Sequence, residues 1–200
     1  MKTIYFGTAA NPFHLGHREI INSLTALDFV NEYDRIVIDV CQNHPWGKEM
    51  APWEARVRMT KRSLSGVMVR HFVDVLDDVN PATTTYDRLL QLRNYQKIMD
   101  DVSIVLGFDN AAQIEKFTAA PCLIDNNEFI IIARQNVDKN ELEKVLVKFK
   151  RVKYIELDMP ISSTLVREWC RIGDHESLCG SVSINIEDEC LELYKGAAMK

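Results

Sequence analysis

Short apolar segments rich in β-branched residues alternate with longer segments of helical spacing along this 200-residue chain. The pattern predicts strands at residues 3–6, 35–40, 67–75, 102–106, 129–133 and 154–157. It predicts helices at residues 18–27, 53–64, 85–98, 111–117, 139–149, 163–172 and 186–194, and loops at 42–52, 77–83 and 121–128. Such alternation is typical of an α/β fold, with a doubly wound parallel sheet and helices on both faces. The run at 129–133 is the most continuous, so we expect it to be a central strand.

The composition narrows the class of protein further. Hydrophobic residues make up 46% and charged residues 26% of the chain, which suits a single globular domain spanning 1–200, completed by C-terminal helices at about 163–195. A net charge of -5 argues against a nucleic-acid partner, and no apolar run is long enough to span a membrane. Because we find no signal peptide and only five scattered cysteines, we expect a cytoplasmic protein without a disulfide framework or zinc site.

The turn between the first strand and the first helix carries the residues GTAANPFHLGH, at positions 7–17. His14 and His17 stand where the helix begins, and a helix N-terminus offers free N–H groups and a positive dipole end to an anion. The stretch has neither the Gly-Lys-Ser/Thr of a Walker loop nor a Gly-x-Gly-x-x-Gly pattern, so no bound dinucleotide cofactor is indicated. Alone, it fits an ordinary strand–helix turn as well as a phosphate site.

A second polar stretch, MPISSTLVRE at positions 159–168, also follows a strand and opens a helix. Ser162 and Ser163 are good N-cap residues, and Arg167 lies one turn further along the same helix face. Alone, this stretch is best interpreted as a capped helix with a surface arginine. Two such helix starts at the carboxyl ends of parallel strands face one edge of the sheet, however, and together their hydroxyl, imidazole and guanidinium groups suit a polyphosphate.

These two stretches match the HxGH and ISSTxxR signatures of the nucleotidyltransferase superfamily, whose domain is Rossmann-like. Within it, the chain most resembles the bacterial nicotinate or nicotinamide mononucleotide adenylyltransferases over essentially its whole length. Further matches are Gly107-Phe108-Asp109 to a GxD motif, Thr85-Tyr86-Asp87-Arg88-Leu89 to TxDxL, and Leu193-Tyr194 to a terminal LY.

The resemblance implies transfer of AMP from ATP to nicotinate or nicotinamide mononucleotide, giving the dinucleotide NaAD or NAD and pyrophosphate in NAD biosynthesis. It implies Mg²⁺ carried by the ATP phosphates, with no metal-binding side chains, and small-molecule partners only, while a homo-oligomer stays open. The expected catalytic residues are His14, His17 and Arg167, with His17 nearer the α-phosphate. The expected ATP-binding residues are Gly7, Thr8, Ala9, His14, His17, Lys48, Gly107, Asp109, Ile161, Ser162, Ser163, Thr164 and Arg167. Thr85, Phe117 and Arg134 are expected to bind the mononucleotide.

Three departures from the family pattern stand out. Thr8 replaces the second glycine of the usual GGTFDP, Phe117 stands where a tryptophan is common, and Arg134-Gln135-Asn136 replaces RPG. Two alternatives therefore stay open. One is a pantetheine-phosphate adenylyltransferase, although Asp109 stands where that family usually has arginine, and the other is a nucleotide-binding sensor that has lost turnover.

Overall fold

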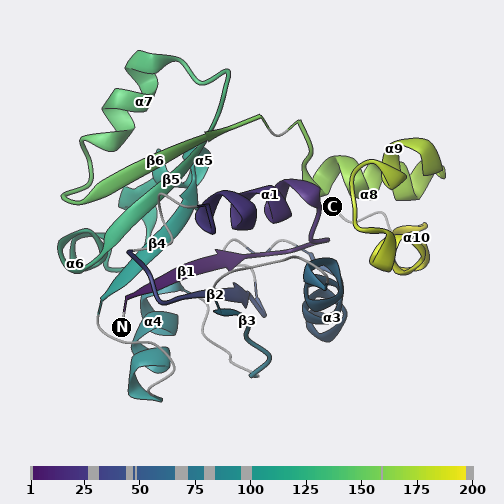
Figure 1. Cartoon of the computed structure of the whole chain (residues 1–200), viewed down its shortest axis with the longest axis horizontal. Coiled ribbons are helices and arrows are strands. Elements are labelled where there is room, and N and C mark those ends of the chain that lie inside the picture. The colour runs from purple at the N-terminus through teal and green to yellow at the C-terminus, as the bar shows by residue number, and fades with distance from the viewer. Residues whose placement is uncertain are drawn as a thin grey trace.

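The computed structural model describes residues 2–26, 32–43, 47, 49–65, 72–78, 84–95, 101–158 and 160–196. Its centre is a parallel sheet of six strands in the order β3-β2-β1-β4-β5-β6 (Figure 1). The strands are β1 Thr3–Thr8, β2 Arg35–Val40, β3 Phe72–Val75, β4 Val102–Gly107, β5 Glu128–Arg134 and β6 Val152–Leu157. The α-helices are α1 Leu15–Leu24, α3 Trp53–Leu64, α4 Thr85–Asn94, α5 Phe108–Ala111, α6 Ala120–Asn126, α7 Lys139–Leu146, α8 Ser163–Ile172, α9 His175–Cys179 and α10 Glu187–Tyr194. The described residues also include two 3₁₀ turns, η1 Ile114–Lys116 and η2 Ile184–Ile186.

The predicted fold class is confirmed, because helices pack on both faces of the sheet. Ile21 of α1 and Val57 of α3 belong to the apolar cluster on one face. Leu89 of α4, Leu123 of α6 and Val145 of α7 belong to the cluster on the other face. The sheet therefore presents its carboxyl edge, and not its faces, for ligand binding.

Some predicted element positions are wrong. The loop expected at 121–128 is largely helix α6, because Pro121 occupies its first turn, where proline is well tolerated. The helix expected at 111–117 is divided between α5 and η1, and α9 was not predicted because five residues are too few to show a helical period. Strand β5 is buried and interior but lies next to the edge strand β6, whereas β1 and β4 form the middle of the sheet. The strand expected at 67–75 and the helix expected at 85–98 lie partly outside the described residues.

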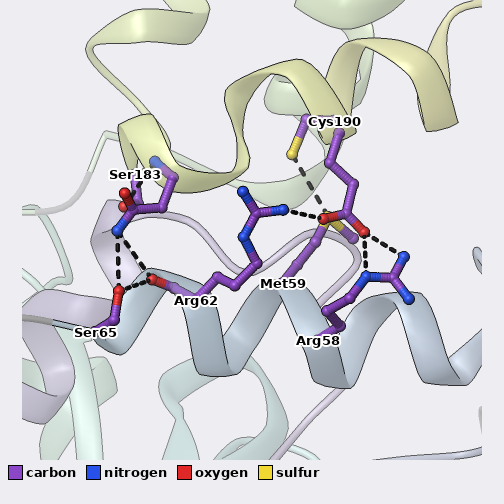
Figure 2. Close-up of polar contacts among 8 residues, drawn as sticks. Arg58, Met59, Arg62, Ser65, Ser183 and Cys190 are labelled. Carbon is purple, nitrogen blue, oxygen red and sulfur yellow. Dashed lines mark hydrogen bonds and ion pairs between the residues drawn. The ribbon is translucent and has the colours of Figure 1, made fainter.

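Helices α8, α9 and α10 pack on α3 rather than on the sheet, around a third apolar cluster that includes Met59, Val166 and Cys190. Figure 2 shows this contact, in which the Cys190 Sγ lies 3.8 Å from the Met59 Sδ. Between the same two helices, α10 and α3, Glu189 accepts hydrogen bonds from Arg58 Nε at 3.0 Å and from Arg62 Nη1 at 2.9 Å, drawn as dashed lines in Figure 2. Because α10 also packs on α8, these contacts fix the start of α8 relative to the sheet.

At the amino edge of the sheet, the Glu128 carboxylate is held by groups from three other segments. Its Oε2 accepts hydrogen bonds from the Ser103 hydroxyl at 2.6 Å and the Tyr33 hydroxyl at 2.7 Å, and lies 3.1 Å from the Lys2 ammonium. Burial alone would raise the pKa of Glu128, but these partners outweigh it and lower that pKa from 4.5 to about 2. The folded protein therefore stabilises the charged form of Glu128.

We expect Glu128 to make the stability of the protein depend on pH between about 4.5 and 2. Since its pKa is lower in the folded protein than in the unfolded chain, the stabilisation is present above pH 4.5 and is lost as the pH falls towards 2. Urea unfolding of wild type and Glu128→Gln at several pH values measures this effect. The stability advantage of wild type should shrink by about 2 kcal/mol between pH 7 and pH 3. An advantage that does not change with pH would contradict the assignment.

Candidate active site

The turn between β1 and α1 places polar groups at the carboxyl edge of the sheet. Ala10 has a φ of 45°, a left-handed conformation that costs energy for a residue with a side chain. Its N–H donates to the Thr8 Oγ1 at 3.2 Å, which holds the chain in this conformation. His14 follows as the N-cap residue of α1, with an extended backbone at φ -128° and ψ 172°. The turn thus brings His17 to within 3.3 Å of the Thr8 hydroxyl, with His14 beside it.

The two imidazole rings lie against each other, with their centroids 3.8 Å apart. The His14 backbone N–H donates to the His17 Nδ1 at 3.2 Å, and the His17 Nε2 lies 3.3 Å from the Thr8 Oγ1. Both ring nitrogens of His17 therefore have partners within the protein. The His14 Nδ1, in contrast, is buried and has no partner in the part of the chain that the structure describes.

Both rings are neutral at pH 7. Burial, together with the smaller effect of the positive charge of Arg134 at the end of β5, lowers the pKa of His14 from 6.5 to about 4. Burial also lowers the pKa of His17 well below its usual value, and the neighbouring His14 adds to this shift. Unless an anion is bound, the site therefore holds neutral imidazoles beside an arginine from β5.

The start of α8 contacts this same turn. The Ser163 hydroxyl donates to the Pro12 carbonyl at 3.0 Å, and the Arg167 Nη1 donates to the Asn11 carbonyl at 2.7 Å. A second Arg167 nitrogen lies 3.3 Å from the Thr164 Oγ1. In Figure 1, α8 accordingly lies beside the beginning of α1, beyond the carboxyl end of β1. The two polar stretches at opposite ends of the sequence therefore form one continuous surface.

Asn11 links the turn to the C-terminal helices, a role that the sequence analysis missed. Its Oδ1 accepts hydrogen bonds from the Tyr194 hydroxyl at 2.8 Å and from the Ala51 N–H at 3.1 Å. Its side chain is buried, so both hydrogen bonds are shielded from water. The match of Leu193-Tyr194 to the family's LY was the one available signal for Tyr194, but it gave no role.

Arg56 of α3 is a second residue that the sequence analysis missed. It is 1% exposed and donates to four backbone carbonyls, which belong to Ala9 at 2.6 Å, Cys41 and Ala51 at 2.9 Å, and Gln42 at 3.2 Å. Because these carbonyls lie on the turns after β1 and β2, Arg56 holds the two turns together. Its neighbours Arg58, Lys61 and Arg62 are also basic, and the sequence does not distinguish the buried arginine from them.

The other predicted ATP-binding residues have varied surroundings. Gly7 is exposed directly after the buried part of β1, and a Cβ there would lie 3.2 Å from the Tyr5 ring. A Cβ at Gly107, in contrast, would meet no atom within 4 Å, so the end of β4 is open to a ligand, and Asp109, two residues further on, is exposed. The Ser162 hydroxyl caps α8 by accepting the Leu165 N–H at 3.2 Å. Ile161 packs on the C-terminal apolar cluster, and Lys48 lies outside the described residues.

The structure does not join the predicted mononucleotide residues into one cluster. Arg134 is exposed at the end of β5, within electrostatic reach of His14. Thr85 is half-buried at the first position of α4. Phe117 is partly buried against the apolar cluster that α4 and α6 share, so its ring contributes to packing there. Among the described residues, no hydrogen bond or ring contact joins Thr85 or Phe117 to His14 or His17.

Over the described residues, no group of three or more His, Cys, Asp and Glu side chains could hold a metal ion. The donors that do converge are hydroxyl, imidazole, guanidinium and backbone N–H groups. Guanidinium and backbone N–H groups only donate, and hydroxyl and imidazole groups can donate, so the set suits the oxygens of an anion. In the same described part, no helix is long and apolar enough to cross a membrane.

The fold and this surface together define a nucleotidyltransferase-like α/β protein. The model of the cytidylyltransferase-like family matches residues 5–169, and the chain belongs to that family.

Relatives with assigned names are found over nearly the whole length of the chain. A probable nicotinate-nucleotide adenylyltransferase of Thermotoga petrophila is 26% identical, and the match covers 96% of this chain and 95% of that protein. One of Caldicellulosiruptor bescii is 27% identical, over 84% of this chain and 86% of that protein. The solved structure of Plasmodium falciparum nicotinic acid mononucleotide adenylyltransferase complexed with NaAD has the same fold, with a TM-score of 0.80 at 20% identity, over 97% of this chain and 98% of that one.

Proposed function

We propose that this protein transfers AMP from ATP to nicotinate mononucleotide, or to nicotinamide mononucleotide, and releases pyrophosphate. The observation that carries the proposal is the contact between the two signature stretches, made by Ser163 on the Pro12 carbonyl and Arg167 on the Asn11 carbonyl. The names of the relatives support nicotinate as the pyridine group. The product would be NaAD, or NAD from the amide.

The chemistry demands little acid–base catalysis from the protein. A phosphate oxygen of the mononucleotide attacks the α-phosphorus of ATP, and the bond from that phosphorus to the oxygen bridging to the β-phosphate breaks. The attacking oxygen is already ionised at neutral pH, so no base has to remove a proton. The barrier is the approach of one anion to another, which positioned donors and positive charges lower.

In this proposal the two helix starts share the triphosphate. The pair of His14 and His17 lies at the α-phosphate from α1, and Ser163, Thr164 and Arg167 face the leaving pyrophosphate from α8. The open space at Gly107 would admit the adenosine, with Asp109 near its ribose. Thr85, Phe117 and Arg134 remain the proposed contacts of the mononucleotide, and Lys48 a proposed contact of the phosphates.

Mg²⁺ is proposed to enter with ATP, bound by phosphate oxygens and water. The donor set at the site fits this arrangement, because the described residues offer anion-binding groups and no cluster of metal ligands. Bound in this way, the ion would neutralise charge on the phosphates. The side chains then need only hold the phosphate oxygens in line.

Release of pyrophosphate from MgATP tests the proposal. We expect release with nicotinate or nicotinamide mononucleotide and formation of the corresponding dinucleotide, with parallel kinetics showing which base is preferred. Release from MgATP with phosphopantetheine, but with neither mononucleotide, would show the pantetheine-phosphate reaction instead. ATP binding without release for any acceptor would indicate a sensor and contradict the proposal.

A further inference from the structure

Thr8 has a hydrogen-bonding pattern that a glycine at this position could not have. A threonine hydroxyl has two acceptor lone pairs and one donor hydrogen. The Thr8 Oγ1 accepts the Ala10 N–H at 3.2 Å and lies 3.3 Å from the His17 Nε2. If the His17 Nε2 carries a hydrogen, both lone pairs of the Thr8 oxygen accept hydrogen bonds. The Thr8 hydroxyl hydrogen then points to neither of these two partners.

The geometry decides where the proton of His17 lies. The His17 Nδ1 accepts the His14 backbone N–H at 3.2 Å, and a nitrogen that accepts cannot itself carry hydrogen. The neutral ring therefore carries its hydrogen on Nε2, which donates to Thr8. His17 then has no ring nitrogen left for a substrate, unless it breaks one of these hydrogen bonds.

The hydroxyl hydrogen of Thr8 is consequently the donor that this pair presents. Thr8 is partly exposed at the end of β1, at the edge where the two helix starts meet. Across the described residues, no acceptor takes its hydrogen. A phosphate oxygen at that edge would complete the pattern, with a charge-assisted hydrogen bond.

We propose that Thr8 is a phosphate-binding residue and that His17 is its positioning residue: the phosphate receives a hydrogen bond from the Thr8 hydroxyl, and His17 orients that hydroxyl by donating to its oxygen. This inference rests on the proposed function, since it takes the triphosphate of ATP as the anion. It also explains how a chain with Thr8 in place of the family's second glycine retains a donor at this point.

Three substitutions at one position separate this role from a structural one. Thr8→Ser keeps the hydroxyl, and Thr8→Val keeps the shape without it. Thr8→Gly removes the side chain and opens a direct path from His17 to the phosphate. We expect kcat/KM for ATP to be near wild type in the serine variant and about 10- to 100-fold lower in the valine variant, the range for one hydrogen bond to a charged group.

The comparison of glycine with valine is the decisive one. Both variants lose the hydrogen bond from the Ala10 N–H, so the effect of that loss on the turn is the same in both. A structural role predicts glycine to be at least as harmful as valine, because glycine adds backbone freedom. The proposed role predicts that glycine is several-fold more active than valine. Equal activities, or a valine variant that matches serine, would overturn the proposal.

Nitrogen-15 NMR of the histidine rings gives a readout that does not depend on turnover. In the free wild-type protein at pH 7, His17 should carry its hydrogen on Nε2, and a ring protonated on Nδ1 or on both nitrogens would overturn the proposal. The affinity for MgATP alone, measured by calorimetry, should follow the same order as the kinetics. Because neither measurement needs an acceptor nucleotide, failure of the transfer reaction and failure of the Thr8 assignment are separate results.

Discussion

Replacing His14 with alanine is expected to lower kcat for pyrophosphate release by about 10²–10³, the usual loss when one positioned donor is removed from an anionic transition state. The reason lies in the Nδ1 of His14, which is buried and has no partner among the described residues. A buried polar nitrogen without a hydrogen-bond partner costs free energy, and a ligand that hydrogen-bonds to it removes that cost. Burial and the charge of Arg134 keep the ring neutral until an anion arrives, when the anion raises its pKa again.

Two further variants make the His14 result specific. His14→Asn places an amide near the position of Nδ1 and should recover part of the rate. His175→Ala removes an exposed histidine at the start of α9 and should leave the rate unchanged. Thermal unfolding of each variant checks that the fold is intact. A His14→Ala variant with nearly wild-type kcat would remove His14 from the catalytic residues.

Replacing Arg167 with alanine is expected to be the second large change, of about 100-fold in kcat/KM for ATP. The guanidinium donates to the Asn11 carbonyl at 2.7 Å and lies 3.3 Å from the Thr164 Oγ1, so it is held in place between the two helix starts. Its remaining N–H groups can hold oxygens of the leaving pyrophosphate, and hydrogen bonds to charged groups are the stronger kind. The reverse reaction, which starts from pyrophosphate, should weaken by a similar factor.

The chain offers matched controls for Arg167 on the same helix. Arg167→Lys keeps the charge but loses the planar fork, so it should recover only part of the activity. Arg171 lies one turn beyond Arg167, is half-exposed and pairs with Glu168. Arg171→Ala should therefore change neither direction of the reaction. Unchanged forward and reverse kinetics in Arg167→Ala would contradict the assignment of this residue to the pyrophosphate.

The fold class was predictable because apolar residues recur with different periods in strands and helices, and because segments of the two kinds alternate along the whole sequence. The position of β5 was not predictable in the same way. A strand buried on both faces reads as a continuous apolar run wherever it lies inside a parallel sheet, so the run at 129–133 does not reveal that β6 follows it at the edge. The helix at Ala120–Asn126 was missed because proline is as common in loops as in the first turn of a helix.

The candidate site was predictable where polar groups follow a strand and open a helix, as at His14 and Ser163. Residues that hydrogen-bond to the turns from other parts of the chain leave no such pattern in the sequence. Arg56 binds carbonyls on two separate turns, the most distant of them 47 residues away at Ala9, and Tyr194 reaches Asn11 across almost the entire chain. Such contacts depend on tertiary structure alone, so the sequence could not identify them.

The central claim is that the starts of α1 and α8 bind one triphosphate. A crystal structure of the protein with a non-hydrolysable MgATP analogue tests it most directly. The account predicts phosphate oxygens within hydrogen-bonding distance of His14 or Thr8 on one side and of Ser163 or Arg167 on the other. Phosphates that contact only one helix start, or that lie away from the carboxyl edge of the sheet, would contradict it.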